Sequence, residues 1–144
     1  IFVLVVLGPM VIRWGFRFTL IVGISAYLAR NLIFAACGST AVLIAAQALH
    51  GVCFGCFFAA AFMLVDDLAP KDARNSVQTF FSIFALGVGA FVGGWFAGLI
   101  GESFTDSAGT IDYTGVWLVA AGVAAATLLA FIVTFPKQPA RSSV

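Results

Sequence analysis

The single histidine of the sequence, His50, lies in a long apolar stretch. At helical spacing it shares a face with Gln47, three residues before it, and with Phe54, four residues after it. An ionisable group inside an apolar helix is a candidate functional site, and an ordinary imidazole pKa of about 6.5 makes proton coupling chemically possible. The alternative is a neutral histidine that hydrogen-bonds to a neighbouring helix. The residues alone leave both interpretations open.

Three other charged residues could form ion pairs or gates. Arg30 stands within an apolar stretch, where a charge is energetically expensive. It either snorkels to a lipid surface or caps a neighbouring helix, or it takes part in a gate or an ion pair. The apolar stretches contain no carboxylate, so we expect any partner at that depth to come from outside this chain. Asp66 and Arg74 stand in a charged connection, where a pair between helix ends could close a gate.

Cys53 and Cys56 form a C-x-x-C pair, which in a soluble protein suggests redox chemistry or zinc. Here the pair lies in an apolar helix without further ligands, so we interpret both as small, polarisable packing residues. Neither a phosphate-binding glycine loop nor a nucleophile elbow is present in the sequence. We therefore expect no metal, no cofactor and no enzymatic activity.

The composition indicates that lipid is the solvent for this chain. Of the 144 residues, 62% are hydrophobic and 9% are charged, and the mean hydropathy is +1.13. Soluble domains have about a quarter of their residues charged. The net charge of +1 argues against a nucleic-acid partner. Long unbroken apolar runs favour helices over a transmembrane β-barrel, whose strands alternate. The sequence predicts an all-α membrane protein.

The apolar stretches predict about five transmembrane spans, the first of them partial. We expect Gly8 and Pro9 to break the first span. Small residues at spacing four, from Ala85 through Gly93 to Gly101, predict a closely packed helix face. The chain begins inside an apolar run, so we expect it to be the C-terminal part of a longer protein. The expected spans are 1–8, 18–37, 41–65, 76–101 and 114–135.

The positive charges predict the topology. Six of the seven Lys and Arg residues fall in alternate connections, whereas the connection 102–113 contains only acidic charges. Cytoplasmic connections carry an excess of Lys and Arg. We therefore expect these alternate connections and the C-terminus to face the cytoplasm. The six cations are Arg13, Arg17, Lys71, Arg74, Lys137 and Arg141.

The segment GPMVIRWGFR resembles the cytoplasmic-loop signature of the major facilitator superfamily, G-x-x-x-D-R-x-G-x-R. Gly8, Arg13, Gly15 and Arg17 stand in place, and Ile12 replaces the acidic residue. The resemblance implies the C-terminal helices of a twelve-helix major facilitator fold. It also implies alternating access against a missing N-terminal half around a midplane site.

Within that superfamily the chain is similar to the nucleoside:proton symporters. The similarity is carried by Arg30 and by HGVCFGCFF, VDDLAPKDARNSVQ, GVGAFVGGWFAG and TIDYTGVWLVAAG. It implies proton-coupled uptake of nucleosides across the bacterial inner membrane. In this branch an aromatic and an acidic residue usually occupy the positions of His50 and Gly55, which leaves His50 as the candidate to replace the acid. From their positions we expect Gln47, His50 and Phe54 to contact the substrate, with Arg30, Asp66 and Arg74 as gate or ion-pair candidates.

Two alternatives remain at this point. One is a major facilitator symporter for another small polar solute, and the other is a non-transporting membrane bundle. A transporter should leave a concave, partly polar face that contains His50 and Gln47, whereas a structural bundle should pack that face dry.

Overall fold

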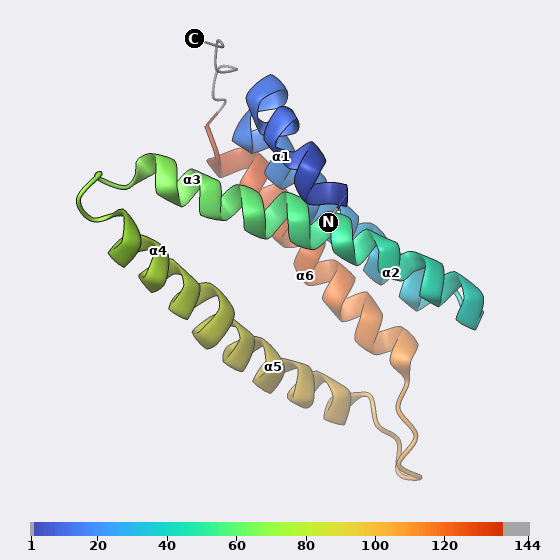
Figure 1. The fold of residues 1–144 in the computed structure, drawn as a ribbon. Coiled ribbons are helices and arrows are strands. Elements are labelled where there is room, and N and C mark those ends of the chain that lie inside the picture. The colour runs from blue at the N-terminus through green and yellow to red at the C-terminus, as the bar shows by residue number, and fades with distance from the viewer. Residues whose placement is uncertain (1, 137–144) are drawn as a thin grey trace.

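The computed structural model describes residues 2–136 and is all-helical, which confirms the predicted class (Figure 1). Two segments are π-helical, η1 and η2, and each continues the α-helices on both sides of it. In the described part of the chain, four helical stretches are long and apolar enough to cross a membrane: Leu7–Ala36, Thr40–Leu68, Arg74–Ser103 and Tyr113–Thr134. The elements are α1 (Phe2–Ala36), α2 (Thr40–Phe54), η1 (Gly55–Ala59), α3 (Ala60–Leu68), α4 (Arg74–Ser82), η2 (Ile83–Val88), α5 (Gly89–Ser103) and α6 (Tyr113–Thr134).

Helix α1 bends at an elbow, and the elbow is not where the sequence predicted a break. The helix continues through Gly8 and Pro9, and its backbone leaves the helical region only at Gly15, with φ 79° and ψ 167°. Such a positive φ is readily adopted by glycine because glycine has no Cβ. The fully buried Thr19 donates its hydroxyl to the Gly15 carbonyl at 3.0 Å. The expected partial span 1–8 is therefore part of an N-terminal arm, residues 2–14, that joins residues 16–36 at Gly15.

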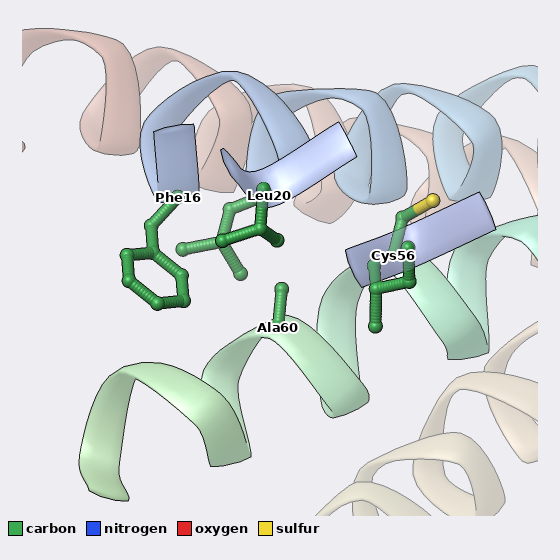
Figure 2. Close-up of a cluster of buried hydrophobic side chains, with 6 residues drawn as sticks. Phe16, Leu20, Cys56 and Ala60 are labelled. Carbon is green, nitrogen blue, oxygen red and sulfur yellow. The ribbon is translucent and has the colours of Figure 1, made fainter. Parts of the chain in front are cut away.

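The largest buried cluster joins both arms of α1 to the η1–α3 helix. Leu7 comes from the first arm, Leu20 from the second, and Cys56 and Ala60 from η1 and α3. Figure 2 shows the Leu20 side chain and Ala60 facing one another across this interface. Cys56 is 4% exposed and Ala60 is 0% exposed, so the small size of both residues lets the helices approach closely.

Helices α1 and η1 approach one another closely at Gly23 of α1. A Cβ at this position would lie 2.8 Å from the Phe57 backbone nitrogen and 3.0 Å from the Phe57 Cβ. Real Cβ atoms do not approach neighbours this closely, so a larger residue would force α1 and η1 apart. This contact fixes the register in which α1 runs beside α2 and η1.

The C-terminus of α6 is held by Arg17, just after the elbow. The Arg17 guanidinium donates to the Ile132 carbonyl at 2.7 Å. In a continuing helix, this carbonyl would accept from the backbone nitrogen of residue 136. That residue is Pro136, which has no N–H. Arg17 therefore supplies the donor that the helix itself cannot supply, and the bond ties the elbow to α6.

The connections with positive charge gather at one end of the molecule. The elbow, the α3–α4 turn and the C-terminal end of α6 lie at the same end, and the α1–α2 and α5–α6 connections lie at the other (Figure 1). Arg13 and Arg17 occupy the elbow, and Lys71 and Arg74 occupy the α3–α4 turn. Lys137 and Arg141 lie outside the described residues.

The long helix formed by α4, η2 and α5 diverges from the other helices (Figure 1). It contains no buried residue. The sequence predicted a closely packed face along its small residues, but a Cβ at Gly93 or Gly101 would have no neighbouring atom within 4 Å. The described chain therefore supplies no partner for this face, and its packing stays a prediction for the full-length protein.

The loop between α5 and α6 is held by two aspartates. The Asp106 carboxylate accepts from the backbone nitrogens of Ala108 and Thr110, at 2.8 and 2.9 Å. The Asp112 carboxylate caps α6 by accepting from the Thr114 nitrogen at 3.0 Å. These bonds satisfy backbone donors in the loop and at the helix start, so α6 begins at a defined residue.

We expect Arg17→Ala to lower the free energy of unfolding of the full-length protein by about 1–2 kcal/mol, because the Ile132 carbonyl loses its donor. Reversible unfolding in detergent measures this change. In a Pro136→Ala background the cost should shrink, because residue 136 then has an N–H. The control is Arg13→Ala, an exposed cation at the same elbow, with a change below about 0.5 kcal/mol. An equal cost of Arg17→Ala in both backgrounds would contradict this role.

We expect Gly23→Ala to destabilise the protein by about 1–3 kcal/mol, because the new Cβ overlaps the η1 backbone. Gly51→Ala is the matched control, since a Cβ at Gly51 would have no neighbouring atom within 4 Å. Its effect should stay within about 0.5 kcal/mol. The same unfolding assay compares the two variants, and equal stabilities would show that the α1–η1 contact is not tight.

Candidate functional site

Arg30 and His50 are hydrogen-bonded across the α1–α2 interface. An Arg30 Nη1 atom lies 3.1 Å from Nδ1 of His50. A guanidinium has only donors, so the imidazole nitrogen must accept, and His50 is neutral in this bond. The sequence led us to expect a partner for Arg30 from outside the chain, and that expectation is wrong. The antiparallel packing of α1 and α2 brings a neutral partner opposite the arginine, where we had considered only carboxylates.

Two aromatic rings of α1 enclose the Arg30 guanidinium. Its Cζ lies 5.3 Å from the ring centroid of Tyr27 and 5.3 Å from that of Phe34. These residues stand three before and four after Arg30, the spacing that places side chains on one helix face. The negative faces of aromatic rings attract a cation. The rings and the imidazole together therefore stabilise the positive charge of Arg30 at membrane depth.

A cavity of about 330 Å³ lies between α1, the α2–η1 helix and α6. His50 and Phe54 line it from α2, Tyr27 from α1, and Thr127 from α6. The Thr127 hydroxyl donates to the Val123 carbonyl at 2.8 Å, which leaves its oxygen lone pairs free to accept. The cavity is therefore mostly apolar and has a few polar groups, the composition typical of a small-molecule site.

Aromatic side chains form much of the cavity wall. The rings of Phe54 and Phe58 have centroids 5.0 Å apart, and those of Phe57 and Phe58 are 5.4 Å apart at 90°. Phe54 is 51% exposed, so its ring face is open. The π-helical turn η1 begins directly after Phe54 and changes the angular spacing of the residues that follow. All three phenylalanines line the cavity, because residues three and four positions after Phe54 lie on the same helix face.

Gln47 lines a second cavity, of about 630 Å³, at the opposite end from the elbow. Phe34, Tyr113 and Trp117 line it as well, and Phe34 and Trp117 pack edge to face with centroids 4.9 Å apart. The sequence predicted that Gln47 and His50 would share one cavity face. The structure places them in different cavities, because Gln47 lies nearly one helical turn closer to the α1–α2 connection.

Asp66 and Arg74 come together at the α3–α4 turn. Arg74 Nη1 lies 3.6 Å from Asp66 Oδ2, and Gln78 donates to Asp66 Oδ1 at 3.1 Å. Both members of the ion pair are about two-fifths exposed, at 42% and 44%. Asp66 and Gln78 also line a cavity of about 390 Å³ with Phe16, next to the elbow. The carboxylate therefore links α3 to α4 beside the first residue of the second α1 arm.

The four residues of the loop signature occupy the elbow region. Gly15 is the bend and Arg17 binds α6, as described above. Gly8 lies within the first arm, and Arg13 is exposed near its end. The sequence missed Tyr27 and Thr127 as cavity residues. The spacing of Tyr27 from Arg30, and a hydroxyl in an otherwise apolar helix, were the signals that could have found them.

The two cysteines of the C-x-x-C pair face different surroundings. Cys56 belongs to the buried cluster, and Cys53 lines the 330 Å³ cavity. Both thiols are free. Among the described residues, no group of three or more His, Cys, Asp or Glu side chains is placed to hold a metal ion.

Comparison with known proteins gives relatives and a structural neighbour. The nucleoside permease NupG of Escherichia coli (strain K12) is 26% identical over 133 residues, which is 90% of this chain and 32% of the permease. The NupG of Shigella flexneri gives the same figures. A crystal structure of a point mutant of the nucleoside transporter NupG superposes with a TM-score of 0.84 at 25% identity, over 92% of this chain and 34% of that one.

The chain thus spans about a third of the length of these relatives. The family model described as "Nucleoside H+ symporter" matches residues 1–140. Because this match covers nearly the whole sequence, the chain belongs to the nucleoside H+ symporter family, as its motifs predicted.

Proposed function

We propose that the full-length protein carries nucleosides together with protons across the bacterial inner membrane. This chain would be its C-terminal part, in a twelve-helix major facilitator fold with a cytoplasmic C-terminus. The family and the relatives named for nucleoside transport support the solute class. The gathering of Arg13, Arg17, Lys71 and Arg74 at one end supports the orientation.

The observation that carries the proposal is the 330 Å³ cavity with His50 beside an open Phe54 ring. A nucleoside is a flat aromatic base joined to a polar sugar. Aromatic side chains stack on base faces with about 1–3 kcal/mol per base in other proteins, and Phe54 offers such a face. His50 and Thr127 add hydrogen-bonding groups for the polar atoms. In this proposal, His50 and Phe54 contact the solute directly.

Gln47 has a separate place in the proposal. It lines the 630 Å³ cavity, on the side of the Arg30–His50 pair that faces the α1–α2 connection. With the cationic connections in the cytoplasm, that cavity opens toward the outer face. Gln47 would then contact the solute before it passes the Arg30–His50 pair, and Arg30 would form part of the gate between the two cavities. Alternating access moves such gates around a fixed site.

We expect His50→Ala and Phe54→Ala each to lower the rate of proton-driven uptake of labelled uridine or adenosine by about tenfold, the effect of one lost hydrogen bond or stacking contact. The assay uses the full-length protein in vesicles with an imposed pH gradient. Val133→Ala, at an 83% exposed position on α6, is the control. Full uptake by both site variants, at normal protein levels, would refute the assignment of the cavity.

We further propose that Asp66 and Arg74 close the cytoplasmic side. We expect Asp66→Asn and Arg74→Ala to slow uptake by about twofold to fivefold, while stability changes by about 0–1 kcal/mol because the pair is partly exposed. The exchanged pair Asp66→Arg with Arg74→Asp should recover part of the lost rate. If the exchanged pair transports no faster than either single variant, an ion-pair gate is excluded.

A further inference from the structure

The bond between Arg30 and His50 has a fixed direction, which decides what His50 can offer to a ligand. The guanidinium donates and has no acceptor, so Nδ1 of His50 carries no proton. A neutral imidazole has one ring proton, which must then lie on Nε2. We propose that Arg30 is a positioning residue that holds His50 with its proton on Nε2, so that the cavity recognises a hydrogen-bond acceptor on its ligand.

The position of Arg30 is itself well determined. Tyr27 and Phe34 hold the guanidinium between their rings, each at 5.3 Å. All three side chains project from α1, so the donor approaches His50 from a rigid helix. A swing of the guanidinium away from His50 would lose both ring contacts and leave a charge at membrane depth. The imidazole therefore meets a fixed donor on its Nδ1 side.

Few other titratable or hydrogen-bonding groups line the cavity beside His50. The titratable groups that line the cavity near His50 are Tyr27 of α1 and Cys53 of its own helix. From α6 the cavity receives the Thr127 hydroxyl, whose proton is donated to the Val123 carbonyl. In this proposal Thr127 offers the ligand an acceptor, and His50 offers it a donor, Nε2–H.

The donor on His50 has a consequence for ligand recognition. This step rests on the nucleoside transport proposed above. A donor in the cavity recognises a ring nitrogen, a carbonyl oxygen or a sugar oxygen with a free lone pair. An analogue in which that one atom is replaced cannot accept from Nε2–H, so its binding loses this hydrogen bond. His50 therefore contributes to the discrimination among nucleosides. Arg30 decides that His50 does so as a hydrogen-bond donor and not as an acceptor.

Nitrogen NMR of the full-length protein tests the proton position without any substrate. The protein is labelled with ¹⁵N-histidine, and the His50 signals are those missing from His50→Phe. We expect an unprotonated Nδ1 and a protonated Nε2 in the natural protein. Arg30→Lys should keep this pattern because an ammonium group also only donates, whereas Arg30→Met should shift the Nδ1 signal toward that of an unbonded imidazole. A proton on Nδ1, or an Nδ1 signal unchanged in Arg30→Met, would overturn the proposal.

Ligand binding tests the consequence. The affinities of adenosine and of analogues that each lack one acceptor, the deaza and deoxy forms, are measured on the same variants. We expect one analogue to bind about tenfold more weakly than adenosine to the natural protein. That ratio should fall toward one in Arg30→Met and in His50→Phe, without further loss in the double variant. Lys71→Met, which removes an exposed cation of the α3–α4 turn, should keep the ratio.

The outcomes separate this inference from the function on which it rests. If neither adenosine nor uridine binds, the proposed function fails, and the nitrogen spectrum still decides the role of Arg30. If adenosine binds and every analogue binds equally well, the recognition of an acceptor by His50 is overturned. If Arg30→Met lowers the thermal stability and weakens the binding of adenosine and of every analogue equally, the analogue ratio stays unchanged. That result would assign Arg30 a structural role only.

Discussion

The close approach of α1 and η1 at Gly23 determines the geometry of the candidate site. With no side chain at Gly23, the Phe57 backbone lies directly against α1. Cys56 and Ala60 fill the same interface with minimal volume. When two antiparallel helices stay packed together, residues equally far from a contact point on the two helices lie opposite one another. That register carries Arg30 to His50 seven residues further along α1, and it closes one wall of the cavity.

The lipid environment explains why two arginines of this chain, Arg17 and Arg30, have partners on neighbouring helices. Hydrocarbon contains no water that could solvate a charge or hydrogen-bond an unpaired carbonyl. Arg30 is stabilised by two rings and an imidazole. The carbonyl that Pro136 leaves without a helical donor receives one from Arg17. In both cases the hydrogen bond of the arginine joins two helices.

The cavities of about 630 and 330 Å³ lie at different positions along the helices. The larger cavity lies at the end with the α1–α2 and α5–α6 connections, and the smaller one lies deeper, beside η1. Phe34 faces the first and Tyr27 faces the second, with the Arg30 guanidinium held between the two rings. The divergent α4–α5 helix, in contrast, takes no part in either cavity within the described chain.

The sequence by itself determined the class and the family, and it drew attention to the polar residues within the apolar stretches. Hydropathy and charge patterns are properties of single stretches, so they identified membrane helices. The loop signature indicated the major facilitator superfamily, and segments such as HGVCFGCFF and VDDLAPKDARNSVQ indicated the nucleoside symporter family. His50 and Arg30 were recognised separately, because each is a polar group in an apolar run.

Only the tertiary structure decided how these residues are combined. The bend falls at Gly15 because positive φ needs a residue without a Cβ, whereas Pro9 fits within the helix. Helical spacing placed Gln47 beside His50, but the cavities are formed by three helices at once, and the neighbours α1 and α6 assign the two side chains to different spaces. The pairing of Arg30 with His50 joins residues 20 positions apart. Such a contact depends on helix register, which is set by packing volumes at Gly23 and cannot be read from either stretch alone.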